Sequence, residues 1–222
     1  MQRRYDLGRE LLKWLAIVTM TIDHAGVALY PEYPVFRYIG RLSYPLFAYL
    51  LVLGLESTRN TKNYITRLLL FALISQVPFY LAFGVQPWEH MNIFFTLSSG
   101  AFFIYSYEKN SHLLLLPLVA SAMLPFDYGI YGILAIGCFY FLRRNRALGA
   151  ILFILLTLSF LPVWSYQFFA LLSIPLVLLH NEGKITFKRI GEKADYPLWK
   201  KYFFYAYYPL HLLVIYFLKG GF

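Results

Sequence analysis

The stretch LLKWLAIVTMTIDHAGVALY, residues 11–30, decides the fold of this chain. It is long and apolar enough to span a bilayer as a helix, which needs about 20 residues. Near its far end stand an acid and a histidine, Asp23 and His24. A charge in hydrocarbon costs roughly 2.5–3.5 kcal/mol even on the gentler insertion scales, so a chain that keeps such a pair is expected to use it. The plainer interpretation is a polar pair that joins helices or sits at the water interface.

The composition extends this interpretation to the whole chain. Of the 222 residues, 59% are hydrophobic and only 14% are charged, against about 25% charged in a typical soluble domain. The apolar runs are too long and continuous for barrel strands, so they predict a polytopic all-α transmembrane bundle, a single domain over residues 1–222. About nine spans are expected, and whether the short fifth and sixth cross fully stays open. They cover residues 11–30, 36–57, 64–84, 92–108, 112–126, 128–142, 147–163, 166–180 and 202–219.

The formal net charge of +9 does not indicate nucleic acid, because the basic residues fall in alternate loops. With the N-terminus inside, all of the 20 Lys and Arg residues except Arg37, Arg41 and Lys219 lie on the cytoplasmic side. This bias predicts an N-terminus inside and a C-terminus outside. The longest loop, residues 180–201, is then a cytoplasmic linker or a short surface helix.

Several features of the sequence exclude other classes of protein. The single cysteine, Cys138, allows neither a disulfide nor a Cys-based metal site within the chain, and no metal is expected. The first apolar run has no small-residue cleavage pattern after it, so it is expected to be a retained span. Since there is no Gly-rich phosphate loop, zinc helix motif or Gly-x-Ser-x-Gly elbow, a bound nucleotide would be held by scattered Arg and Lys of the cytoplasmic face.

Polar residues from several spans are predicted to lie in one layer, in the outer half of the membrane. At 1.5 Å per residue, Asp23 and His24 lie roughly 18–20 Å up the first span. Arg41 of the second span and His211 of the last are the other ionisable members of a cavity predicted to open toward the outside. The further polar residues of this layer are Ser75, Gln76, Asn92, Thr96, Ser99, Asp127, Tyr207 and Tyr208.

Each of these residues has a plainer interpretation. Arg41 can reach the outer headgroups, and His211 can be a packing histidine bonded to a tyrosine. Asn92, Thr96 and Ser99 are more often hydrogen bonders between helices than substrate ligands.

Seven segments in order along the chain carry a resemblance to a known family. They are LKWLAIVTMTIDH (12–24), IGRLSYPLFA (39–48), TRN (58–60), YITRL (64–68), NIFFTL (92–97), DYG (127–129) and FYAYYPLH (204–211). Together these segments resemble the TraX family of membrane acyltransferases. The departure of Ser43-Tyr44 from the family's more usual Ala-Phe puts no polar candidate in doubt.

The resemblance implies acetyl transfer from cytoplasmic acetyl-CoA to an extracytoplasmic acceptor, in a multi-pass protein of the bacterial cytoplasmic (inner) membrane. The family is named for a conjugation protein that acetylates the N-terminus of pilin. A peptide or protein amine is therefore the expected acceptor, and a glycan or lipid stays open. The resemblance assigns the catalytic roles to Asp23, His24, Arg41 and His211.

The same resemblance places the CoA site on the cytoplasmic side. Arg59, Tyr64 and Arg67 match the Arg/Tyr/Arg pattern of the family there. Because CoA carries phosphates, cationic side chains are needed to hold them, which adds Arg143 and Arg144 to the candidates. The Arg143–Arg146 cluster is otherwise an ordinary topology signal.

The chemistry expected of the outer layer follows from its residue types. Acyl transfer needs a base, and histidine titrates in the right range, with His24 preferred and His211 as the rival. A neighbouring carboxylate can orient the imidazole. Adjacent helical residues point about 100° apart, however, so Asp23 can instead pair with Arg41 and leave His24 to another partner. Arg41 or Tyr208 is the expected oxyanion donor. The residues expected to bind the acceptor are Gln76, Asn92, Thr96, Asp127 and Tyr208.

Two other functions compete with acyl transfer. A small transporter or flippase would use the same buried charges as a substrate pathway. It predicts alternating access and usually an internal repeat, and the sequence has none. A structural assembly factor without chemistry would tolerate neutral polar residues at Asp23 and His24.

Overall fold

The computed structural model describes residues 6–86, 89–184 and 198–220, and these residues form helices and their connections. The predicted all-α fold is confirmed. The α-helices are α1 (Leu7–Leu29), α2 (Val35–Gly40), α3 (Ser43–Ser57), α4 (Thr61–Phe83), α5 (Ile93–Glu108), α6 (Leu116–Met123), α7 (Gly129–Arg144), α8 (Arg146–Phe160), α9 (Ser173–Asn181) and α10 (Leu198–Leu218). Short 3-10 helices, His112–Leu115 and Ser165–Leu172, precede α6 and α9.

The nine predicted spans correspond in order to helical segments of the described chain. Three segments are long and apolar enough to cross a membrane, Leu7–Leu29, Val35–Ser57 and Thr61–Phe83, and the others are shorter apolar helices. These segments indicate a membrane protein. The direction in which they cross stays a prediction, and most of the long loop at residues 180–201 lies outside the described residues.

The second span is interrupted at Arg41 and Leu42, between α2 and α3. Pro45, in the first turn of α3, has no N–H to donate to the carbonyl of Arg41, and its ring crowds that carbonyl. The helix therefore breaks at Arg41 and restarts at Ser43. The break lies beside the first helix, because α1 packs along both α2 and α3.

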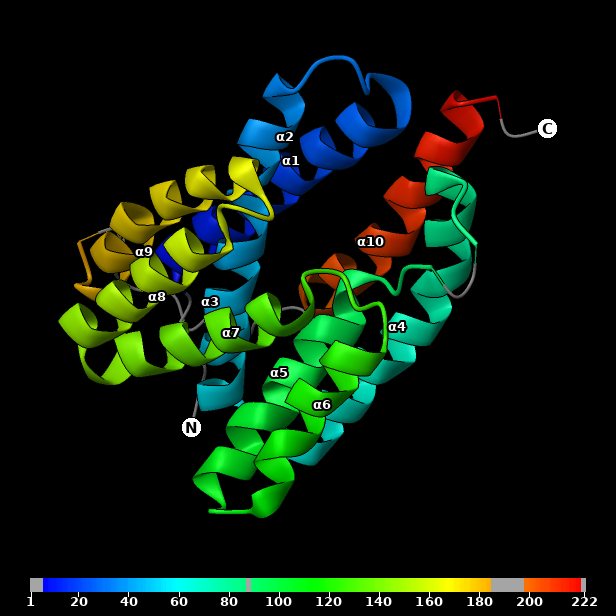
Figure 1. Cartoon of the computed structure of the whole chain (residues 1–222). Coiled ribbons are helices and arrows are strands. Elements are labelled where there is room, and N and C mark those ends of the chain that lie inside the picture. Colours follow the sequence, from blue (N-terminus) through cyan, green and yellow to red (C-terminus); the bar gives the residue numbers. More distant parts are fainter. Residues whose placement is uncertain (1–5, 87–88, 185–197, 221–222) are drawn as a thin grey trace.

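The helices gather in two groups with α7 between them (Figure 1). One group holds α1, α2 and α3 with α8 and α9, and the other holds α4, α5, α6 and α10. Helix α7 packs against α3 on one side and α5 on the other, whereas α1 meets α10 and α4 through fewer contacts. Helix α7 is thus the main connection between the two groups.

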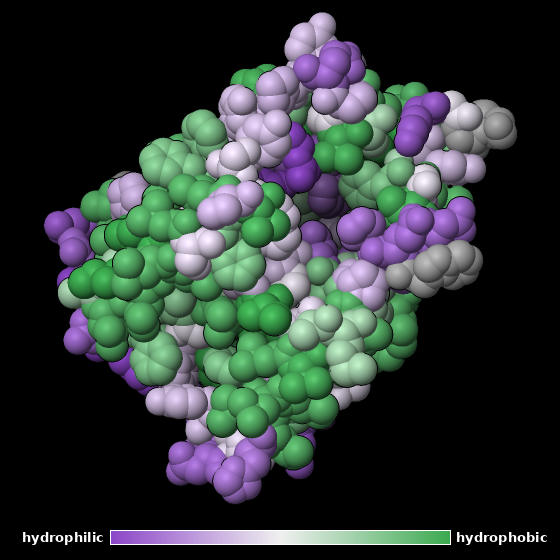
Figure 2. Space-filling view, viewed as in Figure 1, coloured by the Kyte–Doolittle hydropathy of each residue, from purple (hydrophilic) through white to green (hydrophobic). Residues whose placement is uncertain are grey.

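The surface agrees with a membrane environment. Hydrophobic side chains cover the middle of the visible face and hydrophilic ones gather toward its ends (Figure 2). Leu70, Leu73 and Val77 of α4 are more than half exposed, as expected of a helix that faces lipid. The same view shows a hollow with hydrophilic walls between the α1–α2 corner and the ends of α4 and α10.

Candidate active site

Asp23 of α1 is held by two arginines. Arg37 Nη1 donates to its Oδ2 at 2.8 Å, and Arg41 Nη2 lies 3.3 Å from the same oxygen and 3.4 Å from Oδ1. Gly40 packs directly on the carboxyl group, and a Cβ at that position would overlap it. The four-residue spacing of the two arginines on α2 and the small residue between them therefore build this ion pair.

Arg41 also reaches the other side of the helix break. Its Nη1 is 3.5 Å from Gln167 Oε1, and its guanidinium lies over the Tyr128 ring, 5.4 Å from the centroid. Gln167 is fully buried and donates in turn to Tyr131. The Nε of Arg41 is buried and has no hydrogen-bond partner among the described residues. One donor of this guanidinium is therefore available to a ligand.

His24 pairs with His211 and not with Asp23. His24 Nδ1 and His211 Nε2 lie 2.8 Å apart, and His211 Nδ1 lies 3.0 Å from the carbonyl oxygen of Tyr207. A carbonyl only accepts, so His211 Nδ1 carries the hydrogen and, in the neutral pair, His211 Nε2 accepts from His24 Nδ1. The lone pair of His24 then sits on Nε2. The arrangement is that of a base oriented by a second group, with a histidine in the place of the usual carboxylate.

A cavity of about 430 Å³ adjoins the arginine–Asp23 cluster. It lies where the end of α2 approaches the segment before α7 and the segment between α8 and α9. Its charged and aromatic walls are formed by Arg37, Arg41, His90, Asp127, Tyr128 and Trp164. Of the residues predicted to surround a cavity, Arg41 and Asp127 line this one, whereas Asp23, His24 and His211 are not among its described lining residues. Its opening toward the outside stays a prediction.

Asp127 is fixed through its backbone. Its N–H donates to the carbonyl of Met91 at 2.9 Å, and its carbonyl accepts from the Thr96 hydroxyl. Burial raises the pKa of the Asp127 carboxyl to about 6, although the nearby positive charge of Arg41 opposes this. Thr96 therefore positions the acid without lining the cavity, and Asp127 supplies a carboxylate that titrates just below neutrality.

Gln76 and Asn92 form a separate cluster that closes the turn before α5. The Asn92 side chain donates to Gln76 Oε1 at 2.6 Å and to the Ala72 carbonyl at 2.7 Å, and it accepts from the Phe94 N–H. Gln76 Nε2 donates to the carbonyl of His90. Neither side chain belongs to the described lining of the cavity. Their visible role is to cap α5 and to hold the loop that carries His90.

Tyr208 of α10 lies between the histidine pair and Asp127. Its ring makes an edge contact with His24 at 5.9 Å between centroids, and it is close enough to Asp127 for a coulombic interaction. Phe83 of α4 contacts the His24 ring from another direction, at 5.3 Å. The described surroundings of His24 therefore come from α1, α4 and α10.

At the opposite end of the bundle, Arg67 lies over two tyrosine rings, Tyr64 at 5.5 Å and Tyr205 at 5.8 Å. Arg9 is near the same tyrosine, Tyr64, and donates to Ser57 Oγ at 3.2 Å. The Nε atoms of Arg9 and Arg67 are both buried without a partner in the described structure. Arg59 is exposed nearby, at the turn before α4. Arg9 was not expected from the sequence, since one arginine near the N-terminus looks like a topology signal.

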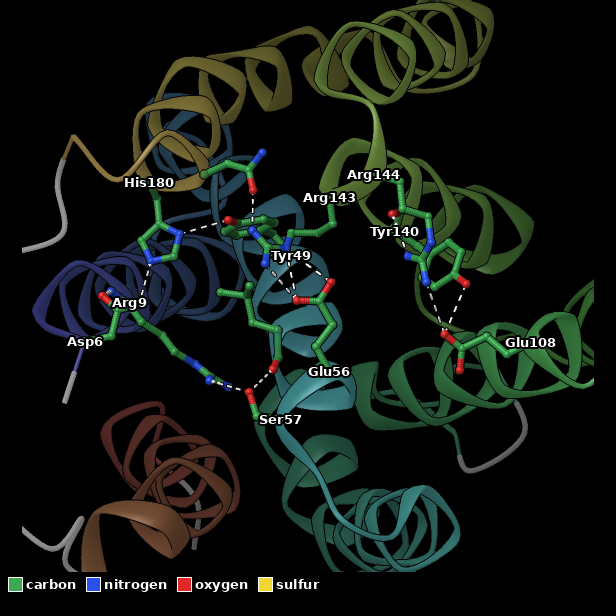
Figure 3. A network of polar contacts seen from close by, with 12 residues as sticks. Asp6, Arg9, Tyr49, Glu56, Ser57, Glu108, Tyr140, Arg143, Arg144 and His180 are labelled. Carbon is green, nitrogen blue, oxygen red and sulfur yellow. Dashed lines mark hydrogen bonds and ion pairs between the residues drawn. The ribbon is translucent and has the colours of Figure 1, made fainter. Parts of the chain in front are cut away.

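Arg143 and Arg144 are engaged in ion pairs with acids of neighbouring helices (Figure 3). Arg143 lies 3.0 Å from Glu56 and also donates to the side chain of Asn181. Arg144 lies 3.3 Å from Glu108. The ends of α3, α5, α7 and α9 therefore meet on one side of the molecule, as the predicted alternation of loops requires.

The residues around Asp23 and the adjoining cavity are called the outer cluster, because that end is predicted to lie outside. Some of them were not predicted as site residues. From the sequence, Arg37 was placed only among the basic residues outside the cytoplasmic side, although its four-residue spacing from Arg41 is consistent with a shared acidic partner. His90, Trp164 and Gln167 lie in or near connections between helices, where no local pattern distinguishes a cavity wall from an ordinary loop.

Comparison with known proteins places the whole chain. The family described as TraX protein matches residues 8–219. The chain is 27% identical over 245 residues to the probable fimbrial assembly protein FimC, serogroup H1, of Dichelobacter nodosus, covering 97% of both chains. It is 28% identical over 219 residues to Protein TraX of Escherichia coli, covering 93% of this chain and 85% of that protein. No solved structure matches.

Proposed function

The chain belongs to the TraX family, and we propose that it is an integral membrane acyltransferase. It moves an acetyl group from cytoplasmic acetyl-CoA to an amine of an extracytoplasmic peptide or protein. The name of the Dichelobacter nodosus relative, a fimbrial assembly protein, favours a subunit of a surface fibre as acceptor.

The observation that carries the proposal is the His24–His211 pair, which follows directly along α1 from the arginine-bound Asp23. The hydrogen bond of His211 to the Tyr207 carbonyl sets the tautomer of both rings, so that His24 Nε2 is the free lone pair. A base oriented in this way is what acyl transfer to an amine requires. His24 is thus the catalytic residue, and His211 is a positioning residue that acts through it.

The proton steps balance around His24. His24 Nε2 takes a proton from the acceptor amine as the nitrogen attacks the thioester carbonyl carbon. The new C–N bond forms, the C–S bond breaks, and the imidazolium returns its proton to the departing thiolate sulfur. A protonated amine loses one further proton to water before the attack.

Arg41 is the proposed donor to the oxyanion that develops on the carbonyl. Its Nε is buried without a described partner, and a preorganised charged donor is most effective in a site shielded from water. Asp23 then acts indirectly, because its ion pairs hold Arg37 and Arg41 in place. Asp23 is thus the positioning acid of the arginines and not of the histidine.

The donor enters from the cytoplasmic side in this proposal. Arg67, Tyr64 and the exposed Arg59 remain the proposed CoA residues, and Arg9 joins them because its Nε lacks a described partner. Guanidinium groups bind phosphates well. Arg143 and Arg144 are weaker candidates, since Glu56 and Glu108 already neutralise them.

The test is direct. Purified protein in lipid nanodiscs is incubated with radiolabelled acetyl-CoA and short peptides with a free N-terminus. Label is expected in the peptide, and pre-acetylated peptides are expected to stay unlabelled. Transport of the peptide or of acetyl-CoA across vesicles without label in any acceptor would overturn the proposal in favour of a transporter.

A further inference from the structure

We propose that Asp127 and the ring of Trp164 form a subsite that holds a protonated primary amine. The inference rests on the proposed acetyl transfer for its purpose, since this amine would be the acceptor. The binding itself is a separate property of the cavity and can be tested without any reaction.

The carboxylate of Asp127 lines the cavity without a hydrogen-bond or ion-pair partner among the described residues. Both cavity arginines donate to Asp23, and within the described chain Asp127 has neither an ion pair nor a side-chain hydrogen bond. Its N–H and carbonyl are occupied by Met91 and Thr96. The carboxylate is therefore the polar group of this residue that remains for a ligand, and a cation is the ligand that a partly buried carboxylate favours.

The backbone next to Asp127 is built for this placement. Tyr128 has φ 62°, a left-handed conformation that a non-glycine residue adopts only where the surroundings impose it. The Tyr128 ring is held by Tyr44, with which it stacks at 4.1 Å between centroids. The strained residue thus fixes the direction in which Asp127 enters the cavity.

Trp164 supplies a fixed aromatic wall of the same cavity. It contacts the rings of Tyr128, Tyr131 and Phe160 at 6.2, 6.0 and 5.8 Å between centroids. It nevertheless lines the cavity together with Asp127. An ammonium beside a carboxylate and an indole ring gains both an ion pair and a cation–π contact.

The position and size of the subsite fit an acceptor. Tyr208 contacts the ring of His24 and is close enough to Asp127 for a coulombic interaction, so an amine held by Asp127 is in the same part of the molecule as the proposed base. The cavity volume of about 430 Å³ falls in the range of small-ligand sites, about 300–1,000 Å³. It can take the end of a peptide and not a folded domain.

The charges that face Asp127 give the expected pH dependence. Burial raises its pKa to about 6, Arg41, Arg37 and His90 oppose this rise, and Asp23 adds to it. The carboxylate is ionised above this value, so ammonium binding is expected to be full near pH 7 and to weaken as the pH falls below about 6.

The experiment measures binding to the purified protein without acetyl-CoA, at pH 6.5. The probes are phenylalanylglycinamide, its desamino analogue, and Nα-acetyl-lysinamide. The wild-type protein should prefer phenylalanylglycinamide to the desamino analogue by about 10–100-fold, the value of hydrogen bonds to charged groups. Asp127→Asn should abolish that preference, Asp127→Glu should retain part of it, and Glu89→Gln, an exposed acid of the neighbouring loop, should leave it unchanged.

The outcomes separate this inference from the proposed function. Equal binding of the first two probes by the wild-type protein, or a preference that survives in Asp127→Asn, overturns the subsite. Tighter binding of Nα-acetyl-lysinamide supports the subsite with a side-chain amine as its source. A pH dependence that persists in His90→Gln and vanishes in Asp127→Asn assigns the titration to Asp127. Amine-selective binding in a protein that transfers no acetyl group would refute the proposed function alone.

Discussion

The two ends of this helix bundle contain the same residue types but use them for different purposes. At the end predicted to lie outside, called the outer end, His24 Nδ1 bonds to His211, and His24 Nε2 has no partner among the described residues. At the other end, predicted to lie inside and called the inner end, His180 is bonded on both sides, by Nδ1 to the Tyr49 hydroxyl at 2.8 Å and by Nε2 to Asp6 at 3.1 Å (Figure 3). Tyr49 is fully buried. A histidine, an aromatic neighbour and an acid therefore do not by themselves mark an active site.

What differs is whether polar atoms remain unsatisfied and have space beside them. The outer cluster retains the Nε of Arg41 and the carboxylate of Asp127 next to a cavity. The inner network, formed by Asp6, Tyr49 and His180, has these side chains bonded to one another and ties α1, α3 and α9 together. Partial burial raises the pKa of Asp6, yet hydrogen bonds from His180 and the Arg9 amide outweigh it and hold that pKa below its ordinary value. The role of the inner network is thus to stabilise the fold, and it is called the inner lock below.

The largest effect is expected at His24 and His211 of the outer end. His24→Ala should lower turnover by about 10²–10⁴-fold, the usual contribution of a general base. Acetyl-CoA affinity should stay unchanged, because the change lies at the other end of the proposed route. Near-normal turnover in His24→Ala together with its loss in His211→Ala would make His211 the base.

The role of His211 can be separated from mere packing. His211→Gln can still accept from His24 Nδ1 through its amide oxygen, whereas His211→Leu cannot. The leucine variant should lose about tenfold in turnover, the value of one net hydrogen bond, and the glutamine variant should keep most of it. Equal losses in the two variants would mean that His211 acts through its shape and not through the hydrogen bond.

A smaller effect is expected where unpaired arginines are proposed to meet CoA. Replacing Arg9 and Arg67 by Gln removes two charge-assisted contacts to phosphate, so the Michaelis constant for acetyl-CoA should rise about 10–100-fold. Turnover at saturation should change little. If the constant stays at its wild-type value, these arginines are not part of the donor site.

Much of the architecture could be predicted from the sequence, because long apolar runs indicate helical membrane spans. The polar layer could be anticipated from depth alone, and the structure pairs its ionisable members as Asp23 with Arg41 and His24 with His211. Pairing could not be anticipated, since whether Asp23 faces His24 or Arg41 depends on the break before Pro45 and on the closeness of Gly40. Gln76 and Asn92 looked like ligands because a buried amide that caps a helix has the same sequence signature as one that binds a substrate.

Disruption of the inner lock is expected to lower the stability of the protein without lowering its turnover. His180→Ala removes the hydrogen bonds of His180 to the buried Tyr49 hydroxyl and to Asp6, which should cost about 1–3 kcal/mol of unfolding free energy. Turnover per folded molecule should stay within a few-fold of wild type. Thermal unfolding and active-site titration measure the two quantities. A large loss of turnover in fully folded protein would show that the inner end takes part in catalysis.

Acid should weaken the same lock through Asp6. Its folded pKa is lowered, so the stability it adds is present above the unfolded value of about 3.9 and is lost as the pH falls through the folded value. Asp6→Asn should therefore remove part of the acid sensitivity below about pH 4. An unchanged profile in thermal unfolding at pH 3–5 would place the acid sensitivity elsewhere.

The smallest effect should come from Arg144, which serves as the matched control for Arg67. Both arginines lie near aromatic rings at the inner end, but Arg144 pairs with Glu108, and both of these side chains are about half exposed, 48% each. An exposed ion pair contributes about 0–1 kcal/mol because water already screens it. Arg144→Gln should therefore lower the unfolding free energy by less than about 1 kcal/mol and leave the Michaelis constant for acetyl-CoA unchanged. The constant can instead rise as much as in the Arg9 and Arg67 double variant. Positive charge at this end would then affect acetyl-CoA binding whether or not an acid neutralises it. The distinction between arginines that are paired with an acid and those that are not would fail.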